Sequence, residues 1–228
     1  MPRFRRSNPL ALAVLTCLHE RPMHPYEVAQ TLRHRVKHES IKLNYGSLYS
    51  VVESLLKHGL IEATETVREG RRPERTIYAI TDDGRLEMTE WLSDLVTYPA
   101  NDYTQLEAGL SLIGALSPHD ALAALHARTQ NLVVELERQR AVVTASAKLG
   151  LPRLFTLEAG YRVAMLETEL AFVEQLVKDI ETDALEGIDL WRALYRPDGS
   201  LDPAIVRATA ERFGHLHLST TEPMGPER

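Results

Sequence analysis

The fold is decided by residues 44–61, which read NYGSLYSVVESLLKHGLI. Asn44 is a suitable N-cap, because its side chain can accept a hydrogen bond from a backbone N–H of the first helical turn. Gly59 suits the left-handed position that follows a helix, and Leu60 provides the apolar contact that accompanies such an ending. The stretch therefore predicts a helix that ends at Lys57. Its inward stripe at helical spacing consists of Leu48, Val51, Val52, Leu55 and Leu56.

Two helices are predicted on the N-terminal side of this stretch. Residues 10–18 are apolar on most of the helix surface, which is typical of a helix at the centre of a core. Pro25 suits the first turn of a second helix, from Tyr26 to about Arg35, because proline lacks an N–H that would be unpaired there. Residues 1–9 are interpreted as a basic arm, which either contacts phosphates or is a disordered start.

A β-hairpin is predicted after Gly59, where the apolar period changes from helical to two. The strands cover residues 61–66 and 75–80, and the turn between them is basic. Thr81 is a suitable N-cap for a fourth helix. The apolar face of that helix consists of Leu86, Met88, Trp91, Leu92, Leu95 and Val96. Three helices followed by a hairpin give the element order of a winged helix-turn-helix, whose third helix enters the major groove of DNA.

The chain beyond residues 98–101 is predicted to be almost entirely helical. The expected helices cover residues 103–115, 117–149 and 153–181, with weaker candidates at 190–194 and 203–213. We therefore expect a mainly α protein with three parts. These are a winged helix-turn-helix DNA-binding domain over residues 1–97, a C-terminal helical dimerisation or effector domain over 98–186, and an extension with a flexible tail over 187–228.

Charge is unevenly distributed along the 228 residues. Residues 1–80 contain 13 Lys and Arg against 8 Asp and Glu, whereas residues 81–228 contain 13 against 24. This asymmetry favours a basic partner-binding module joined to an acidic one, although the formal net charge is −6. The single cysteine excludes an intramolecular disulfide, and no apolar run reaches the ~18–20 residues of a membrane helix. We therefore expect a cytoplasmic protein without a membrane partner.

Several stretches, in this order, resemble the PadR family of bacterial transcriptional regulators. They are the apolar residues 10–18, the His24-Pro-Tyr-Glu-Val run, residues 45–61, and residues 71–85 with their Tyr-x-Ile-Thr-x-x-Gly run. The resemblance covers about residues 9–96, and the acidic helices beyond are similar to the longer, virulence-activator-like form of the family. Pro25 stands where the family usually has glycine, which leaves the turn before the second helix open.

The candidate DNA-binding residues form two groups. One group lies at the start of the third helix, where side chains can reach base edges and free N–H groups favour a phosphate oxygen. It consists of Lys42, Asn44, Tyr45, Gly46, Ser47, Tyr49 and Ser50. The other group, on the hairpin, consists of Arg71, Arg72 and Arg75, whose mutual repulsion phosphates would offset. Local packing of the tyrosines and a solvated basic turn are the alternative interpretations.

A dimer seam and an effector pocket are the other candidate sites. Apolar residues in the long helices recur in steps of three and four, which is typical of a coiled-coil seam. The candidate dimerisation residues are Leu122, Leu125, Leu132, Leu136, Leu166, Leu170, Val173 and Leu176, and a hairpin within one chain is the alternative. The family resemblance implies that Trp91 and Leu95 can help form a pocket for a small aromatic effector, although Trp91 could equally be an ordinary core or dimer-contact residue.

The residues carry no pattern typical of catalysis, of a metal site or of a cofactor site. We therefore expect a protein that is not an enzyme and binds no cofactor. The function that we expect is sequence-specific binding of double-stranded DNA by a homodimer. It would act as a ligand-responsive repressor at a palindromic operator. The alternatives are a transcriptional activator of the same fold, or a winged-helix module that binds another protein and no DNA.

Overall fold

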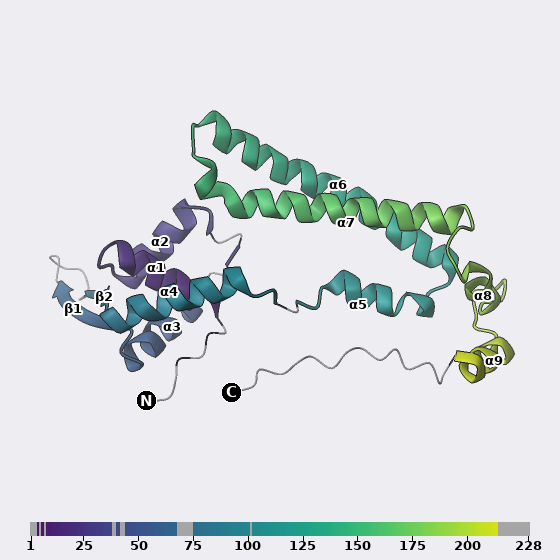
Figure 1. Cartoon of the computed structure of the whole chain (residues 1–228), viewed down its shortest axis with the longest axis horizontal. Helices are drawn as coiled ribbons and strands as arrows, with labels where there is room; N and C mark the ends of the chain where they lie inside the picture. The colour runs from purple at the N-terminus through teal and green to yellow at the C-terminus, as the bar shows by residue number, and fades with distance from the viewer. Residues whose placement is uncertain are drawn as a thin grey trace. The chain divides into compact units, whose positions relative to one another are not determined.

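The computed structural model describes residues 4, 6, 8–37, 40, 41, 44–67, 75–100 and 102–213. The chain divides into two compact units, Met1–Asp102 and Tyr103–Arg228 (Figure 1). In the described ranges, no helix is both long enough and apolar enough to cross a membrane.

The first unit has the winged helix-turn-helix order that the sequence predicts (Figure 1). Its elements are α1 (Pro9–Glu20), α2 (Pro25–His34), α3 (Tyr45–Lys57), β1 (Ile61–Val67), β2 (Arg75–Ile80) and α4 (Asp82–Thr97). The two strands are antiparallel with Ile61 opposite Ile80, and a register shift lies between Ala63 and Glu65. The predicted fold class, mainly α with a two-stranded wing and a C-terminal helical domain, is confirmed.

Helix α1 provides the centre of the first core. Leu10, Val14 and Leu15 are at most 1% exposed, and the helix contacts α2, α3, α4 and β2. Burying one such leucine side chain contributes ~1.5–3 kcal/mol. Asn8 begins the helix, since its Oδ1 accepts a hydrogen bond from the Leu10 N–H at 3.1 Å. The prediction of a central apolar helix is therefore confirmed.

The segment between α1 and α2 pairs with the wing, which the sequence analysis missed. The Met23 N–H donates to the Tyr78 carbonyl at 3.0 Å, and the Tyr78 N–H donates to the Met23 carbonyl at 3.1 Å. His24 then caps α2, because its Nδ1 accepts from the Tyr26 N–H at 3.1 Å, while the Glu27 carboxylate accepts from the His24 N–H at 2.9 Å. Pro25 fits the first helical position, so the turn before α2 is a regular capping box.

The start of α4 is fastened to the end of α3 by Thr81. Its hydroxyl donates to the Gly59 carbonyl at 2.7 Å and accepts from the Gly84 N–H at 3.1 Å. Its backbone N–H donates to the Leu60 carbonyl at 3.1 Å. These bonds bring α4 so close to the chain after α3 that only glycine fits at position 84. The Gly-Leu and Thr-x-x-Gly runs noticed in the sequence therefore meet at one contact.

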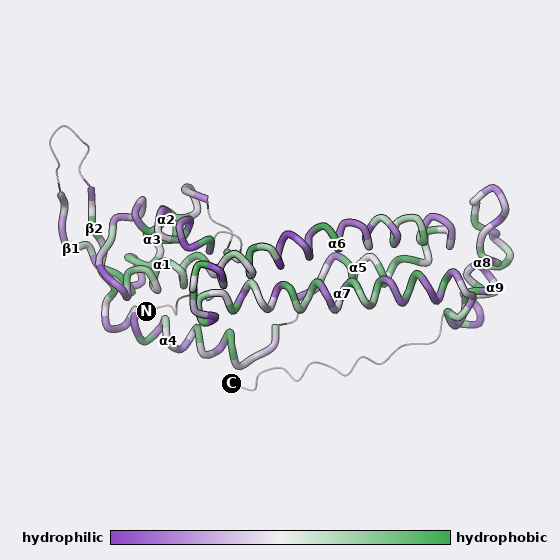
Figure 2. The backbone as a smooth tube through the Cα atoms, turned by 90° about the horizontal axis from the view of Figure 1, so that it is seen from above, coloured by the Kyte–Doolittle hydropathy of each residue, from purple (hydrophilic) through white to green (hydrophobic). Residues whose placement is uncertain are grey.

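The second unit is built on a long helical hairpin. Its elements are α5 (Gln105–Ser111), the short 3-10 helix η2 (Ile113–Ala115), α6 (Pro118–Lys148), the 3-10 turn η3 (Arg153–Thr156), α7 (Leu157–Glu181), α8 (Ile188–Ala193) and α9 (Pro203–Phe213). Helices α6 and α7 lie side by side (Figure 1). Hydrophobic and hydrophilic residues alternate along both (Figure 2), as the predicted seam requires.

The core of the second unit includes residues beyond the hairpin. Ile188 and Trp191 of α8 belong to the same buried cluster as Leu125 and Val173, and the Trp191 Nε1–H donates to the Leu116 carbonyl at 2.9 Å. The prediction of one helix over residues 103–115 is wrong in detail, because α5 ends at Ser111 and a 3-10 turn follows. This stretch contains two glycines, which are poor helix formers.

Candidate nucleic-acid interface

The start of α3 is an open helix end held by Asn44. The Asn44 Oδ1 accepts a hydrogen bond from the Ser47 N–H at 2.6 Å, which is the cap that the sequence predicts. Gly46 lies in open space, since an added Cβ would meet only the Asn44 Oδ1 at 3.7 Å. The Ser50 hydroxyl donates to the Gly46 carbonyl at 3.2 Å, which holds this side chain against the first turn.

Helix α3 presents two different faces. Its inner face is anchored by Leu48, Val52 and Leu55, which are at most 3% exposed. Its outer face carries Tyr49, which is 47% exposed, and Ser50, which is also exposed. The inner residues fix the helix on the core, so the outer face is a rigid, solvent-accessible surface. Local burial of the Tyr49 ring is not observed.

The predicted residues of the first group therefore gather at one end of α3. Asn44, Gly46, Ser47, Tyr49 and Ser50 all lie within its cap and first two turns. Tyr45 is the first residue of the helix. The predicted contact at Lys42 lies outside the described residues.

The wing contributes one described basic residue, at the end of its strands next to the turn. Arg75 is the first residue of β2, is exposed, and pairs with Val67 in the strand register. Arg71 and Arg72, at the tip of the predicted hairpin, lie outside the described part of the chain. Burial and the positive charge of Arg75 together lower the pKa of His24. Neutral His24 keeps the lone pair with which its Nδ1 caps α2.

The predicted effector residues differ sharply in exposure. Trp91 is 3% exposed and belongs to the core of the first unit, whereas Leu95, one turn later on α4, is 55% exposed. The ring of Phe4 lies 5.9 Å from the Trp91 ring, centroid to centroid, at an interplanar angle of 57°. The Trp91 ring already has an aromatic partner within its own chain, so a ligand would have to displace that partner.

The predicted dimerisation residues lie in the α6–α7 hairpin of a single chain. Four of them are buried, namely Leu125, Leu132, Leu136 and Val173. Four are partly buried against the same core, namely Leu122, Leu166, Leu170 and Leu176. The structure thus places the predicted seam between two helices of one chain, which was the alternative interpretation. Its role in joining two chains stays a prediction.

The outer face of α7 carries four large apolar side chains. Leu157, Tyr161, Met165 and Phe172 are each 50–68% exposed. Their spacing of four, four and seven residues places them on one side of the helix. Val173, Val177 and Ile180 turn another side of α7 toward the core, so these four side chains form an apolar face open to solvent.

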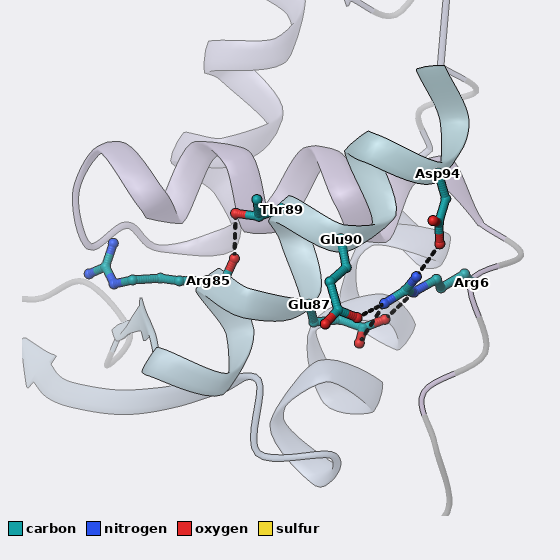
Figure 3. Close-up of polar contacts among 6 residues, drawn as sticks. All are labelled: Arg6, Arg85, Glu87, Thr89, Glu90 and Asp94. Atoms are coloured by element: carbon teal, nitrogen blue, oxygen red, sulfur yellow. Dashed lines mark hydrogen bonds and ion pairs between the residues drawn. The ribbon is translucent and has the colours of Figure 1, made fainter. Parts of the chain in front are cut away.

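Sequence reasoning placed Arg6 in the basic arm, but the structure binds it to α4. Its Nε donates to Glu87 Oε1 at 2.6 Å, and its Nη2 donates to Glu90 Oε2 at 2.7 Å (Figure 3). Its Nη1 is paired with Asp94. The hydrogen bonds that Arg6 donates to Glu87 and Glu90, with the negative charges of Glu87 and Asp94, raise the pKa of Arg6 further above its usual range. The i, i+3, i+7 spacing of the acids was the signal that could have indicated this contact.

Within the described residues, no group of three or more His, Cys, Asp or Glu side chains could hold a metal ion. Cys17 is buried in α1, 2% exposed, and burial raises the pKa of its thiol to about 11. This burial agrees with the predicted central position of the helix over residues 10–18.

Comparison with known proteins gives one family and a set of similar folds. Residues 14–90 match the model of the transcriptional regulator PadR-like family. The crystal structure of Bacillus subtilis PadR in complex with operator DNA has 17% identity and a TM-score of 0.61, covering 76% of this chain and 99% of that chain. Curated protein sequences give no match.

Two further solved structures are similar. Bacillus subtilis PadR in complex with p-coumaric acid has 16% identity and a TM-score of 0.61, covering 75% of this chain and 98% of that chain. The Vibrio cholerae virulence activator AphA has 15% identity and a TM-score of 0.57, covering 76% of this chain and 98% of that chain. The resemblance inferred from the sequence is confirmed by the family match, and these structures confirm the fold.

Proposed function

Through residues 14–90 this chain belongs to the transcriptional regulator PadR-like family, and we propose that it binds double-stranded DNA sequence-specifically as a homodimer. In this proposal it is a cytoplasmic repressor that occupies a palindromic operator and responds to a small aromatic ligand. The observation that carries the proposal is the start of α3, where a capped helix end exposes Tyr49 and Ser50 on a rigid support beside the half-buried Ser47.

The exposed end of α3 has the chemistry needed to read base edges. Serine hydroxyls donate and accept hydrogen bonds, and a tyrosine ring adds an apolar surface for a thymine methyl group. Helix N-termini also attract phosphate oxygens, because their backbone N–H groups point outward. Gly46 allows the backbone to approach a phosphate closely, since no side chain intervenes.

In this proposal the wing contacts DNA phosphates through its positive charge and does not contact the bases. Arg75 and the Arg71-Arg72 pair of the sequence would contact phosphates that flank the groove. Each phosphate neutralised releases condensed counterions, so binding must weaken steeply as salt is added. The excess of basic residues in the first 80 positions fits this role, although the whole chain is acidic.

We propose that the second unit joins two chains through the outer face of α7. Four large apolar side chains on this face are at least half exposed in one chain, and a second copy would cover them. A symmetric dimer would present two α3 helices about one DNA turn, ~34 Å, apart. In size-exclusion chromatography with light scattering, Met165→Glu should give monomers, whereas Glu174→Ala, on another side of α7, should leave dimers intact.

The similar structures suggest which ligand to test and whether the protein represses or activates transcription. One is a complex of Bacillus subtilis PadR with p-coumaric acid, which makes an aromatic acid the first ligand to test. The Vibrio cholerae protein is named a virulence activator, so activation is the second candidate function. By linkage, a ligand that weakens DNA binding must itself bind less tightly to the DNA complex, by the same factor.

Fluorescence anisotropy with labelled DNA from the chain's own upstream region, repeated over a salt series, tests the DNA proposal. Tyr49→Ala should weaken binding mainly to the preferred sequence, whereas Arg75→Gln should weaken binding to all duplexes and reduce the salt slope by ~0.9. Arg85→Gln is the matched control, because Arg85 lies on α4 and contacts His19. Equal effects of the two arginine variants would contradict the proposed wing contact.

A further inference from the structure

Arg6 is held by more negative charge than one guanidinium can neutralise. Glu87, Glu90 and Asp94 lie on one face of α4 and all point at Arg6 (Figure 3). The side chains of Glu90 and Asp94 are 49% and 50% exposed, whereas that of Glu87 is 14% exposed. The outer two ion pairs are therefore accessible to salt and to competing ions, which screen exposed pairs strongly.

Phe4 is docked beside Arg6 at the same place. Its ring meets the Trp91 ring of α4 and lies 5.3 Å from the His58 ring, edge to face at 83°. His58 is the C-cap of α3, and its Nδ1–H donates to the Ser54 carbonyl at 2.7 Å. Phe4 thus bridges α4 and the C-terminal end of α3, while Asn44 and Tyr49 lie at the opposite end of that helix, ~20 Å away by helix geometry.

The position of Arg6 excludes a second role at the same time. A guanidinium recognises carboxylate and phosphate oxygens through the same fork of N–H groups. Arg6 directs four of its five N–H groups at Glu87, Glu90 and Asp94, so no pair of N–H groups remains to form a fork with a DNA phosphate. Arg6 lies two residues before Asn8, so at ~3.3–3.6 Å per extended residue its Cα can move within ~7 Å of Asn8, and its long side chain extends that reach.

We propose that Phe4 and Arg6 form a latch on α4, and that DNA phosphates compete with the α4 carboxylates for Arg6. In the latched state Trp91 is covered and Arg6 is withheld from DNA. In the released state Trp91 is uncovered and Arg6 adds one phosphate contact. The competition of DNA phosphates for Arg6 depends on the proposed DNA binding, whereas the docking of Phe4 on Trp91 does not depend on it.

The test weakens the latch without touching the proposed DNA-binding residues. Glu90→Gln combined with Asp94→Asn removes the two accessible carboxylates and leaves Glu87 in place. Asp82→Asn combined with Asp83→Asn is the matched control, because it removes two charges from the same helix and does not involve the carboxylates that hold Arg6. All variants also carry Trp191→Phe, so that Trp91 is the remaining tryptophan, and circular dichroism verifies that they fold.

The latch makes two separate predictions for the Glu90→Gln/Asp94→Asn variant. Acrylamide quenching of Trp91 fluorescence should rise at least ~2-fold over the control, since quenching follows exposure of the ring to solvent. The plot of log affinity against log salt should steepen by ~0.9, the slope of one added phosphate contact. Adding Arg6→Gln to this variant should remove the steeper slope and keep the increased quenching. If Phe4 and Arg6 had only a structural role, the Glu90→Gln/Asp94→Asn variant would not change the slope.

The outcomes separate this proposal from the function on which it rests. If all variants bind DNA with the slope of the matched control, the competition for Arg6 is wrong and DNA binding stands. If Trp91 quenching does not change, the docking is not held by the two carboxylates and the latch is wrong. If no variant binds any duplex, the proposed function fails, and with it the competition.

Discussion

Gly84→Ala should destabilise the first unit, although glycine to alanine in a helix is usually favourable. Gly84 lies in the first turn of α4, and its φ is not in the left-handed region, so alanine meets no backbone strain there. A Cβ at this position would lie 2.0 Å from the Leu60 carbonyl oxygen and 2.8 Å from the Ile80 Cγ1. The oxygen belongs to a backbone that the Thr81 N–H holds at 3.1 Å, so it cannot rotate aside.

The two opposing effects can be compared in magnitude. Alanine gains up to ~1 kcal/mol over glycine inside a helix. Overpacking usually costs ~1–3 kcal/mol and more in severe cases, and an overlap of more than an ångström with backbone is severe. The clash therefore wins, and we expect the free energy of unfolding to fall by ~2 kcal/mol or more, about a 30-fold change in the folding equilibrium.

The assay is urea unfolding of the first unit, followed by Trp91 fluorescence in a Trp191→Phe background. Gly160→Ala in α7 is the control, because nothing lies within 4 Å of its added Cβ. Circular dichroism of the full chain in urea should show this control as stable as the parent or slightly more stable. A Gly84→Ala protein as stable as the parent would refute the reasoning, since it would mean that α4 does not approach Leu60 so closely.

Three further predictions concern single side chains. Iodoacetamide at pH 8 should label Cys17 only as fast as the unit unfolds. Its raised pKa should also make stability fall as pH rises from about 9 to about 11, because the unfolded thiol ionises first. Arg138 and Gln139 lower the pKa of Glu135 to about 2. NMR titration should confirm this value, and the stability that Glu135 contributes should be lost as pH falls from 4.5 towards 2. Asn44→Ala should cost ~1 kcal/mol in urea unfolding, whereas Asn44→Asp should keep the cap and weaken DNA binding by repelling phosphates.

The sequence predicts the first unit well because its elements are defined by local signals. Asn44 caps α3, Thr81 caps α4, and both bonds are present in the structure. The pairing of Met23 with Tyr78 was missed, because a single bridging residue has no period to recognise. The contact of Gly84 with Leu60 joins residues 24 positions apart. The sequence therefore showed Gly84 only as the last residue of the Tyr-x-Ile-Thr-x-x-Gly run, and did not show that packing requires a glycine there.

The second unit was harder to interpret because two kinds of helix pairing leave the same pattern. A seam with steps of three and four serves equally a hairpin within one chain and an interface between two. The structure assigns Leu125, Leu132 and Val173 to the hairpin, so the sequence pattern could not identify a dimer surface by itself. Arg6 shows a similar limit, since a basic arm can be bound by its own acidic helix as well as by a phosphate.

The central claim is that a dimer of this chain reads DNA with the start of α3, and selection from a random-sequence duplex library tests it most directly. We expect enrichment of an inverted repeat whose half-sites lie about one helical turn, ~34 Å, apart. We also expect that the Tyr49→Ala protein enriches the same sequence less strongly. Recovery of no preferred sequence by the unmodified protein at low salt would contradict the claim, and would favour a winged-helix module that binds another protein.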